Sequence, residues 1–430
     1  MFHSLLSSWT LFFGLAMIMI GNGLQLVLLG LRADQAGYST LMTGVMMGGY
    51  FLGLFLGSLT VPKFLSQVGH IRIFGALASL ASAAVLLHLV FEQPLVWALM
   101  RLVTGLSYAG MYIVVESWLN EKSTNETRGQ MLSVYMIITM GGLGLGQLLA
   151  GSDDGQSAML FLLASVLVSL AVVPILLSAA KAPEFSEPER ISLRRLWQIS
   201  PLAMFGMFLQ GLSVAMLFGM GPSFGRQIGL SAPEVSIFVA SATVGVLLLQ
   251  YPLGRLSDRM DRRLLILGSS AVAFVVAGLA VLASGASFSL LLLFMGLYGG
   301  LNLTLYSMFI AHANDYLSPR QMVSTASALL MINGIGAVLG SPLVAMMMEL
   351  FGTLAYFAML GLGNLLLVGF VLVRIRARAA VPTEAQGPLV AFPEAGTAVA
   401  ASLNPEAAWS EAETGPAEED ALADNPYLPQ

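Results

Sequence analysis

The sequence predicts an all-α polytopic membrane protein with twelve transmembrane helices in two six-helix bundles. Of its 430 residues, 57% are apolar and only 10% are charged, whereas a soluble domain carries about 25% charged residues. Apolar runs of about 20 residues, the length that crosses a bilayer, recur along the chain. Lysine and arginine gather in alternate breaks between these runs, as they do in multi-span membrane proteins.

Each apolar run is taken as one span, and most of the breaks between them are short. The expected spans, in chain order, lie near residues 10–31, 42–61, 73–91, 95–117, 130–150, 157–179, 201–221, 234–253, 264–284, 288–311, 322–348 and 353–373.

The longest break divides the chain into two similar halves. Residues 180–200 hold three glutamates, four basic residues and two prolines, which is typical of a linker. Fourteen residues separate Arg128 from Gly142 in the first half, and fourteen separate Arg320 from Gly334 in the second. Corresponding spans run in the same direction, so the repeat is parallel and suits two bundles that move against each other. The expected domains are a bundle over 1–180, a cytoplasmic linker over 181–200, a bundle over 201–375 and a tail over 376–430.

Orientation follows from the positive charges. With both termini in the cytoplasm, inner loops and the start of the tail hold 16 of the 19 lysines and arginines. Only Arg32 and Arg226 fall outside, and Arg101 lies within a span. Positive charge favours the cytoplasmic side, so we expect a multi-pass protein of the cytoplasmic (inner) membrane with both termini inside.

The tail has the composition of a disordered segment. Residues 379–430 contain seven prolines and nine acidic residues, and such a segment buries too little apolar surface to fold. We expect a disordered cytoplasmic appendage; the alternative is a segment that binds a partner or regulates the protein.

One span carries a polar stripe. On a helix over residues 99–121, five residues fall within an arc of about 80° on one face. They are Arg101, Gly105, Tyr108, Tyr112 and Glu116. An ionisable side chain in a span is costly unless it faces protein or water, so the stripe predicts a wet internal cavity.

Two interpretations are open for each charged end of this stripe. Arg101 is either an anion or proton-relay site in the cavity, which we favour, or an arginine whose long side chain reaches the outer interface. Glu116 is either a carboxylate that couples transport to protons or a member of a cytoplasmic salt-bridge gate. Its place near the inner end of the span favours the gate.

Other polar residues in the middle of spans predict more of the same cavity. Buried amides and phenols need hydrogen-bond partners, which a cavity or a neighbouring helix supplies. The candidates outside the stripe are Asn22, Gln25, Gln210, Tyr298 and Asn302.

The break after the eighth span carries a motif. Its sequence, GRLSDRMDRR over residues 254–263, resembles the loop signature of the major facilitator superfamily. The resemblance implies a cytoplasmic gate in which the glycine permits close packing and the aspartate pairs across the bundle interface. These residues are Gly254, Asp258, Arg259, Arg262 and Arg263. The first-half counterpart departs from the pattern, because Val61 stands where the aspartate should be.

Further segments extend the resemblance over about residues 10–375. Arg101 with Gly105 is similar to the family's fourth-span motif, and Gly336, Gly340 and Pro342 are similar to its glycine–proline packing motif. ESWLN at 116–120 and RGQ at 128–130 resemble the YcaD-like branch. Four residues that bracket the two related inner loops complete the expected gate: Glu121, Arg128, Asp315 and Arg320.

The composition excludes several other classes of function. The chain has no cysteine and only four scattered histidines, which excludes disulfides and thiolate sites and leaves no metal site. The run GGLGLG at 141–146 lies inside a span with no strand before it, so it is not a phosphate loop. We therefore expect no enzyme, no metal and no cofactor.

These features predict a secondary active transporter. The expected activity is proton-coupled export of a small organic solute by alternating access, with no nucleic-acid partner and a monomer in the bilayer. The alternatives are proton-coupled uptake of a small metabolite and a transporter-like sensor or scaffold that does not transport.

Overall fold

The computed structural model describes residues 8–124, 127–153, 157–177, 192–392, 396–397 and 399–405. In these ranges every regular element is helical, and twelve helices are long and apolar enough to cross a membrane. This confirms the predicted fold class and each expected span, with ends that differ by a few residues. The spanning helices are α2 (Trp9–Gln35), α3 (Thr40–Val68), α4 (His70–Val90), α5 (Pro94–Glu121), α6 (Arg128–Leu149), α7 (Met159–Leu176), α9 (Pro201–Gln227), α10 (Ala232–Ser257), α11 (Arg262–Ser284), α12 (Phe288–Asn314), α13 (Pro319–Phe351) and α14 (Ala355–Ala377).

Four short elements complete the described structure: α8 (Leu193–Ile199) and the 3-10 turns η1 (Ala150–Ser152), η2 (Thr383–Ala385) and η3 (Ala400–Leu403). The equivalent turns after the first span of each half both contain a glycine with a positive φ. Gly37 follows α2 with a φ of +70°, and Gly229 follows α9 with a φ of +88°. Only glycine adopts this conformation without strain, so each half turns back sharply after its first span.

Helix contacts within one half recur in the other. In the first half, α2 packs on α6 and α7, α5 on α3 and α4, and α4 on α7. In the second, α9 packs on α13 and α14, α12 on α10 and α11, and α11 on α14. The sequence repeat is therefore a repeat of helix packing as well.

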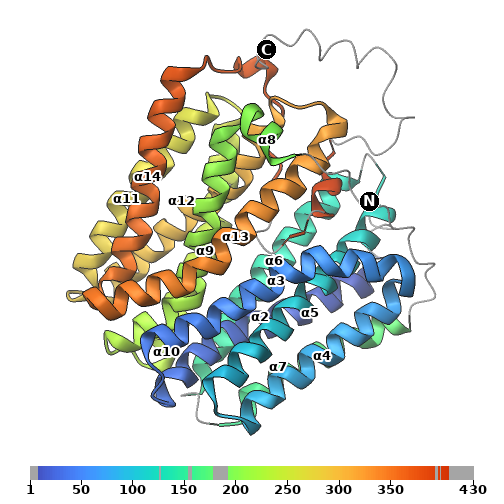
Figure 1. Ribbon diagram of the computed structural model, residues 1–430, viewed down its shortest axis with the longest axis vertical. Helices are drawn as coiled ribbons and strands as arrows, with labels where there is room; N and C mark the ends of the chain where they lie inside the picture. The colour runs from blue at the N-terminus through green and yellow to red at the C-terminus, as the bar shows by residue number, and fades with distance from the viewer. Residues whose placement is uncertain are drawn as a thin grey trace.

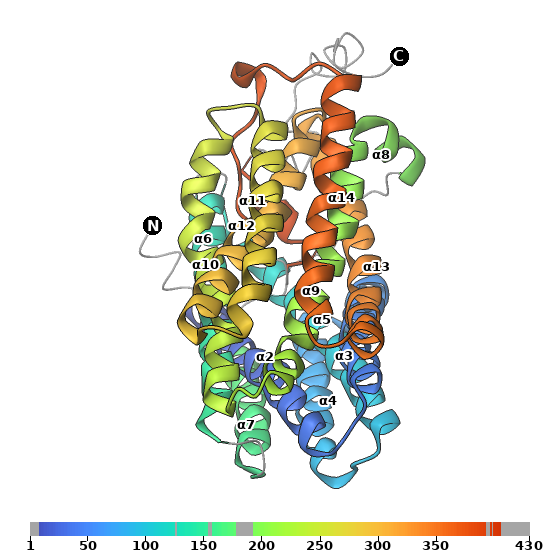
Figure 2. The same ribbon diagram turned by 90° about the vertical axis from the view of Figure 1, so that its left-hand side faces the viewer.

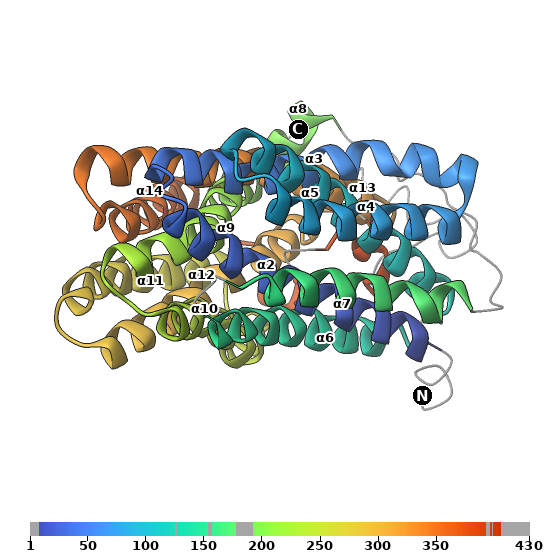
Figure 3. The same ribbon diagram turned by 90° about the horizontal axis from the view of Figure 1, so that it is seen from below.

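The two halves meet at one end and diverge at the other (Figure 1). Direct contacts between them join α3 to α13, α6 to α10 and α2 to α9, and Figure 3 shows α2 and α9 side by side in the middle. We call the end with the α2–α3 and α9–α10 turns the closed end. The opposite end, with the α10–α11 loop and the chain that follows α14, is the tail end.

The linker between the halves is not all loop. Residues 178–191 lie outside the described part of the chain, whereas α8 forms over the rest of the expected linker. It begins at Ser192, whose side chain accepts a hydrogen bond from the Arg195 amide. Leu196 and Ile199 are buried, so α8 packs its apolar face on the second half.

The structure differs from the prediction of a disordered tail over residues 379–405. After α14 the chain turns back and runs between the two halves (Figure 2), and η3 contacts α5, α6 and α13. Phe392, Val399 and Leu403 are buried. Residues 406–430, which carry seven of the nine acidic side chains of the tail, lie outside the described part of the chain.

Candidate functional site

The polar stripe of α5 is buried inside the first half. Arg101, Tyr108, Tyr112 and Glu116 have no solvent-accessible surface. Gly105 explains how closely α3 approaches, since a Cβ atom on it would lie 2.0 Å from the Tyr50 carbonyl oxygen. From Arg101 to Tyr112 the stripe therefore meets α2 and α3 of its own half, whereas Glu116 also meets the tail.

Two amides of α2 hydrogen-bond to three tyrosines. The Asn22 amide donates to the hydroxyl of Tyr50 on α3 at 2.8 Å and to that of Tyr112 on α5 at 3.1 Å. The Gln25 amide donates to the hydroxyl of Tyr108 at 3.0 Å. Three helices thus build one polar cluster, which we call the central cluster: Asn22, Gln25, Tyr50, Arg101, Tyr108 and Tyr112.

Arg101 carries the only formal charge of this cluster. Its guanidinium carbon lies 4.3 Å from the centre of the Tyr50 ring, a cation–π contact. Among the described residues, none of its three guanidinium nitrogens has a hydrogen-bond acceptor, and Asn22 Oδ1 and Gln25 Oε1 have no donor. A buried charge without a partner is strongly unfavourable. The cluster can therefore attract an anionic or acceptor-rich group.

Glu116 lies nearer the tail end and has different partners. It accepts a hydrogen bond of 2.5 Å from the hydroxyl of Tyr135 on α6. The Thr397 amide of the tail lies 3.0 and 3.1 Å from its two oxygens, and the Thr397 hydroxyl also donates to it. In the described part of the chain, no lysine or arginine forms an ion pair with Glu116. The salt-bridge environment favoured from the sequence is not seen here.

The predicted cavity residues of the second half form a separate group. The Asn364 amide on α14 donates to the hydroxyl of Tyr298 at 3.0 Å, and the Asn302 amide donates to Asn364 Oδ1 at 3.3 Å. Gln210 is buried on α9. The hydrogen bonds of this group join α12 to α14, whereas those of the central cluster join helices of the first half.

The motif loop after α10 ties together helix ends of the second half. Arg262 forms an ion pair with Asp315, and its Nε donates to the Ser257 hydroxyl at 3.1 Å. Asp258 accepts a hydrogen bond of 2.7 Å from the Leu389 amide of the tail and lies 3.7 Å from Arg262. The partners of Asp258 therefore belong to its own half and the tail, not to the facing bundle.

Other expected gate residues contribute less to these contacts. Glu121 and Arg259 are exposed, and Arg128 is buried as the first residue of α6. A Cβ atom on Gly254 would lie 3.5 Å from the Leu389 side chain of the tail. The side chain of Arg320 lies outside the described part of the chain.

Asp261 begins α11 and holds Arg263. Its carboxylate accepts hydrogen bonds from the Arg263 amide and guanidinium, both at 2.9 Å. Burial raises the pKa of Asp261, but the hydrogen bonds from Arg263 outweigh it and hold that pKa below its ordinary value. The Asp261 carboxylate therefore stays ionised at neutral pH, and its hydrogen bonds to Arg263 fix the start of α11.

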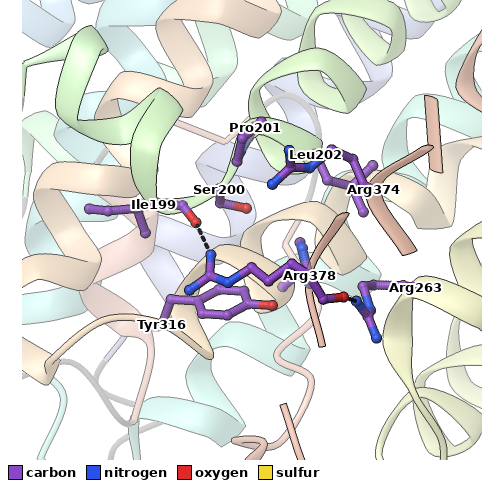
Figure 4. A pocket seen from close by; sticks show the side chains of 9 residues that line it. Ile199, Ser200, Pro201, Leu202, Arg263, Tyr316, Arg374 and Arg378 are labelled. Atoms are coloured by element: carbon purple, nitrogen blue, oxygen red, sulfur yellow. Dashed lines mark hydrogen bonds between the residues drawn. The ribbon is translucent and has the colours of Figure 1, made fainter. Parts of the chain in front are cut away.

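A pocket near the root of the tail is lined by arginines (Figure 4). Arg378 Nη1 donates to the Ile199 carbonyl at 3.0 Å, and Arg263 Nη1 donates to the Arg378 carbonyl at 2.7 Å. The guanidinium of Arg378 lies 4.3 Å from the centre of the Tyr316 ring. Arg374 also lines this pocket. These contacts fix the direction in which the tail leaves α14.

At the closed end, polar contacts join the two halves. Arg226 on α9 forms a 3.2 Å ion pair with Asp34 on α2, and the Leu41 amide of α3 donates to Glu349 on α13 at 2.8 Å. A Cβ atom on Gly44 would lie 2.2 Å from the Ala345 Cβ. This end leaves no room for a solute between α3 and α13.

The sequence also matches a known family over nearly all of its spans. The model of the Major Facilitator Superfamily matches residues 11–200 and 203–417. The chain belongs to the major facilitator superfamily.

Relatives within the superfamily are similar along most of their length. An uncharacterized MFS-type transporter, YcaD, from Escherichia coli O17:K52:H18 is 27% identical over 353 residues, which is 81% of this chain and 90% of the relative. YcaD from Salmonella newport is 26% identical over 339 residues, 78% of this chain and 87% of the relative. The YcaD-like resemblance is thereby confirmed.

Solved transporters share the fold. A variant of the nucleoside transporter NupG superposes with a TM-score of 0.71 at 14% identity, covering 85% of this chain and 99% of that one. A bacterial homolog of the human lysosomal transporter Spinster, inward-facing and unoccupied, gives a TM-score of 0.69 at 14% identity, covering 95% and 99%. At this identity the likeness shows the fold alone.

Three residues of the site carry no recognisable sequence signal of their role: Tyr50, Tyr135 and Thr397. Tyr50 and Tyr135 each stand alone in an apolar span, so nothing in their own helices marks them as partners of α5. Thr397 lies in a segment whose overall composition predicts disorder. A signal was present in that segment: Glu394 is the only charged residue in 385–405, whereas acidic residues crowd the stretch that follows.

Proposed function

We propose that this protein is a proton-coupled secondary transporter that exports a small organic solute across the inner membrane by alternating access. The central cluster is the solute site, and it lies between one end where the halves touch and one end where they diverge. The unpartnered guanidinium of Arg101 carries the proposal, because a charge kept inside a spanning helix is stabilised by a ligand or water that reaches it. The superfamily membership supports transport as the activity and disfavours an enzyme.

The orientation follows from the positive charges. The closed end carries Arg32 and Arg226, whereas the tail end carries the basic α10–α11 loop and the end of α14. By the positive-inside rule, the tail end faces the cytoplasm and the described conformation is closed to the outside.

The chemistry of the central cluster indicates the kind of solute. Arg101 offers a planar set of donors that suits a carboxylate or another anionic group. The Tyr50 ring lies against it, and the rings of Tyr108 and Tyr112 extend this aromatic surface along α5, with ring centres 6.3 Å from Tyr50 to Tyr108 and 6.0 Å from Tyr108 to Tyr112. The free amide oxygens of α2 accept from a donor. We infer an organic anion that also carries hydrogen-bond donors.

Glu116 is the residue that exchanges the coupling proton. Burial makes its charged form costly, so exchanging a proton there during the cycle changes which state of the transporter is favoured. The hydrogen bond from Tyr135 fixes the carboxylate on the first half. The halves then rock about the solute site as one monomer in the lipid bilayer.

A thermal-shift screen of the purified protein against metabolites and drugs, followed by flux in proteoliposomes, tests the proposal. We expect organic anions to raise the melting temperature and to move against their gradient when a proton gradient is imposed. Inside-out and right-side-out vesicles separate export from uptake. A protein that binds no compound and moves none of the library would favour a sensor or scaffold.

A further inference from the structure

The C-terminal tail enters the space between the two halves, where the halves diverge. From Arg378 it passes the motif loop, crosses α12, reaches α5 and leaves along the start of α6. The buried residues of this path include Phe392, Thr397 and Leu403, with exposed fractions of 6%, 8% and 0%. A segment this buried, in a region whose composition predicts disorder, is held by specific contacts.

Contacts to the second half come first along the tail. The Gly387 carbonyl accepts from Arg262, and the Leu389 amide donates to Asp258 at 2.7 Å. The Phe392 amide then donates to the hydroxyl of Ser307 on α12 at 3.0 Å. The motif loop and the C-terminal third of α12 thus hold the tail through its backbone.

Contacts to the first half follow. Thr397 donates through both its amide and its hydroxyl to Glu116 on α5. The turn η3 lies against α5, α6 and α13, and Pro405 lies 3.4 Å from the position that a Cβ atom on Gly129 would take. The described residues of this segment therefore contact both α12, through Phe392, and α5, through Thr397, and these helices belong to opposite halves.

We propose that residues 387–405 are an internal plug that fills the tail end of the transporter and covers Glu116. The plug satisfies the two conditions that an inhibitor of alternating access must meet. It occupies the space through which a solute or water would reach Glu116, and it separates two helices that must approach each other when this end closes. Its release is then a required step before each transport cycle begins. The plug proposal depends on the proposed function in one respect: it assumes that the solute passes through this space.

Thr397 is the contact that decides whether the plug stays. A carboxylate that is buried without partners is costly, and Thr397 supplies two of the donors to Glu116. Proline at this position removes both the amide hydrogen and the hydroxyl. Thr383→Pro is a matched control, because Thr383 is an exposed threonine of the same tail and precedes the plug.

The first test measures access to a position under the plug. Ser307→Cys places the only cysteine of the chain where Phe392 covers it, and the purified full-length protein is labelled with a charged maleimide. We expect labelling at least about a hundredfold faster in Thr397→Pro than in the unaltered tail, because each lost hydrogen bond to a carboxylate favours the open tail by about tenfold or more. Thr383→Pro should label like the unaltered tail. Equal rates in all three proteins would overturn the plug.

The second test asks where the tail lies. In the double variant Gly129→Cys with Pro405→Cys, mild oxidation should join the two residues by a disulfide that retards the protein on a non-reducing gel. Adding Thr397→Pro should slow this reaction, and Thr383→Pro should not. Failure of the pair to cross-link in the folded full chain would place the tail elsewhere. Neither test uses a transported solute. The plug proposal can therefore fail while the transport proposal stands, and the transport proposal can fail while the plug proposal stands.

Discussion

Arg101 and Glu116 lie on one helix, but their surroundings are opposite. The guanidinium of Arg101 has an aromatic ring and no acceptor among the described residues, whereas Glu116 receives donors from α6 and from the tail. The helical spacing in the sequence predicted that both share a face. It could not show which helices that face meets, because the partners Tyr50, Tyr135 and Thr397 come from distant parts of the chain.

Arg101→Ala should reduce solute flux by about hundredfold while the protein still inserts and purifies normally, because the loss of a buried charged contact costs several kcal/mol. Arg101→Lys should restore only part of the flux, since lysine keeps the charge but not the planar set of donors. Flux in proteoliposomes with the compound found by thermal shift is the measurement. The exposed Arg72→Ala is the control. Full flux in Arg101→Ala would exclude Arg101 from the solute site.

Glu116→Gln separates coupling from gating. If Glu116 exchanges the proton, the variant should keep solute exchange at equal concentrations, while the accumulation driven by a proton gradient falls to about background. If it serves a gate, both modes should slow together. Glu121→Gln changes an exposed carboxylate near the end of the same helix and should leave both modes unchanged.

At the scale of elements, glycines decide where helices approach. The motif residues Gly336 and Gly340 face α9, since Cβ atoms there would lie 2.2 and 2.4 Å from carbonyl oxygens of Phe208 and Leu212. Gly44 does the same between the halves. Every spanning helix could be predicted from the sequence because hydropathy is a local property. The pairing of helices could not, because it depends on surfaces that hydropathy does not distinguish.

Gly44→Ala should open the closed end. The new methyl group would overlap Ala345 and the backbone of α13, and such overpacking costs about 1–3 kcal/mol in this conformation only. Spin labels at Ala36 and Leu354, on turns of opposite halves, should report a longer distance between them. Gly141→Ala is the control, because a Cβ atom there would meet nothing within 4 Å. An unchanged distance in Gly44→Ala would show that this contact does not hold the end closed.

At the scale of the whole molecule, the parallel repeat and the positive charges determine how the protein sits in the membrane. Both could be derived from the sequence, since a repeat and a count of arginines need no coordinates. The path of the tail could not be derived from the sequence. Residues 387–405 have no helical period, and the acidic residues that follow them dominate the composition of the whole tail. That path is selected by surfaces that meet only in the fold: the motif loop, α12, α5, α6 and α13.

The proposed orientation predicts which surface cysteines react from outside the cell. Ala36→Cys, on the closed-end turn, should react with an impermeant maleimide on intact cells, whereas Arg194→Cys, on α8, should react only after the cells are broken. Both positions are exposed in the structure, so accessibility within the protein is matched. The opposite pattern would invert the protein in the membrane.

The place of the plug at the end of the chain also sets an order of events during synthesis. Chains emerge from the ribosome N-terminus first, and residues 387–405 follow all twelve spanning helices. The bundle is therefore made before its plug exists, and the newborn protein passes through an unplugged stage. A chain whose translation stops early, after Arg378, would remain at that stage as a permanently unrestrained transporter.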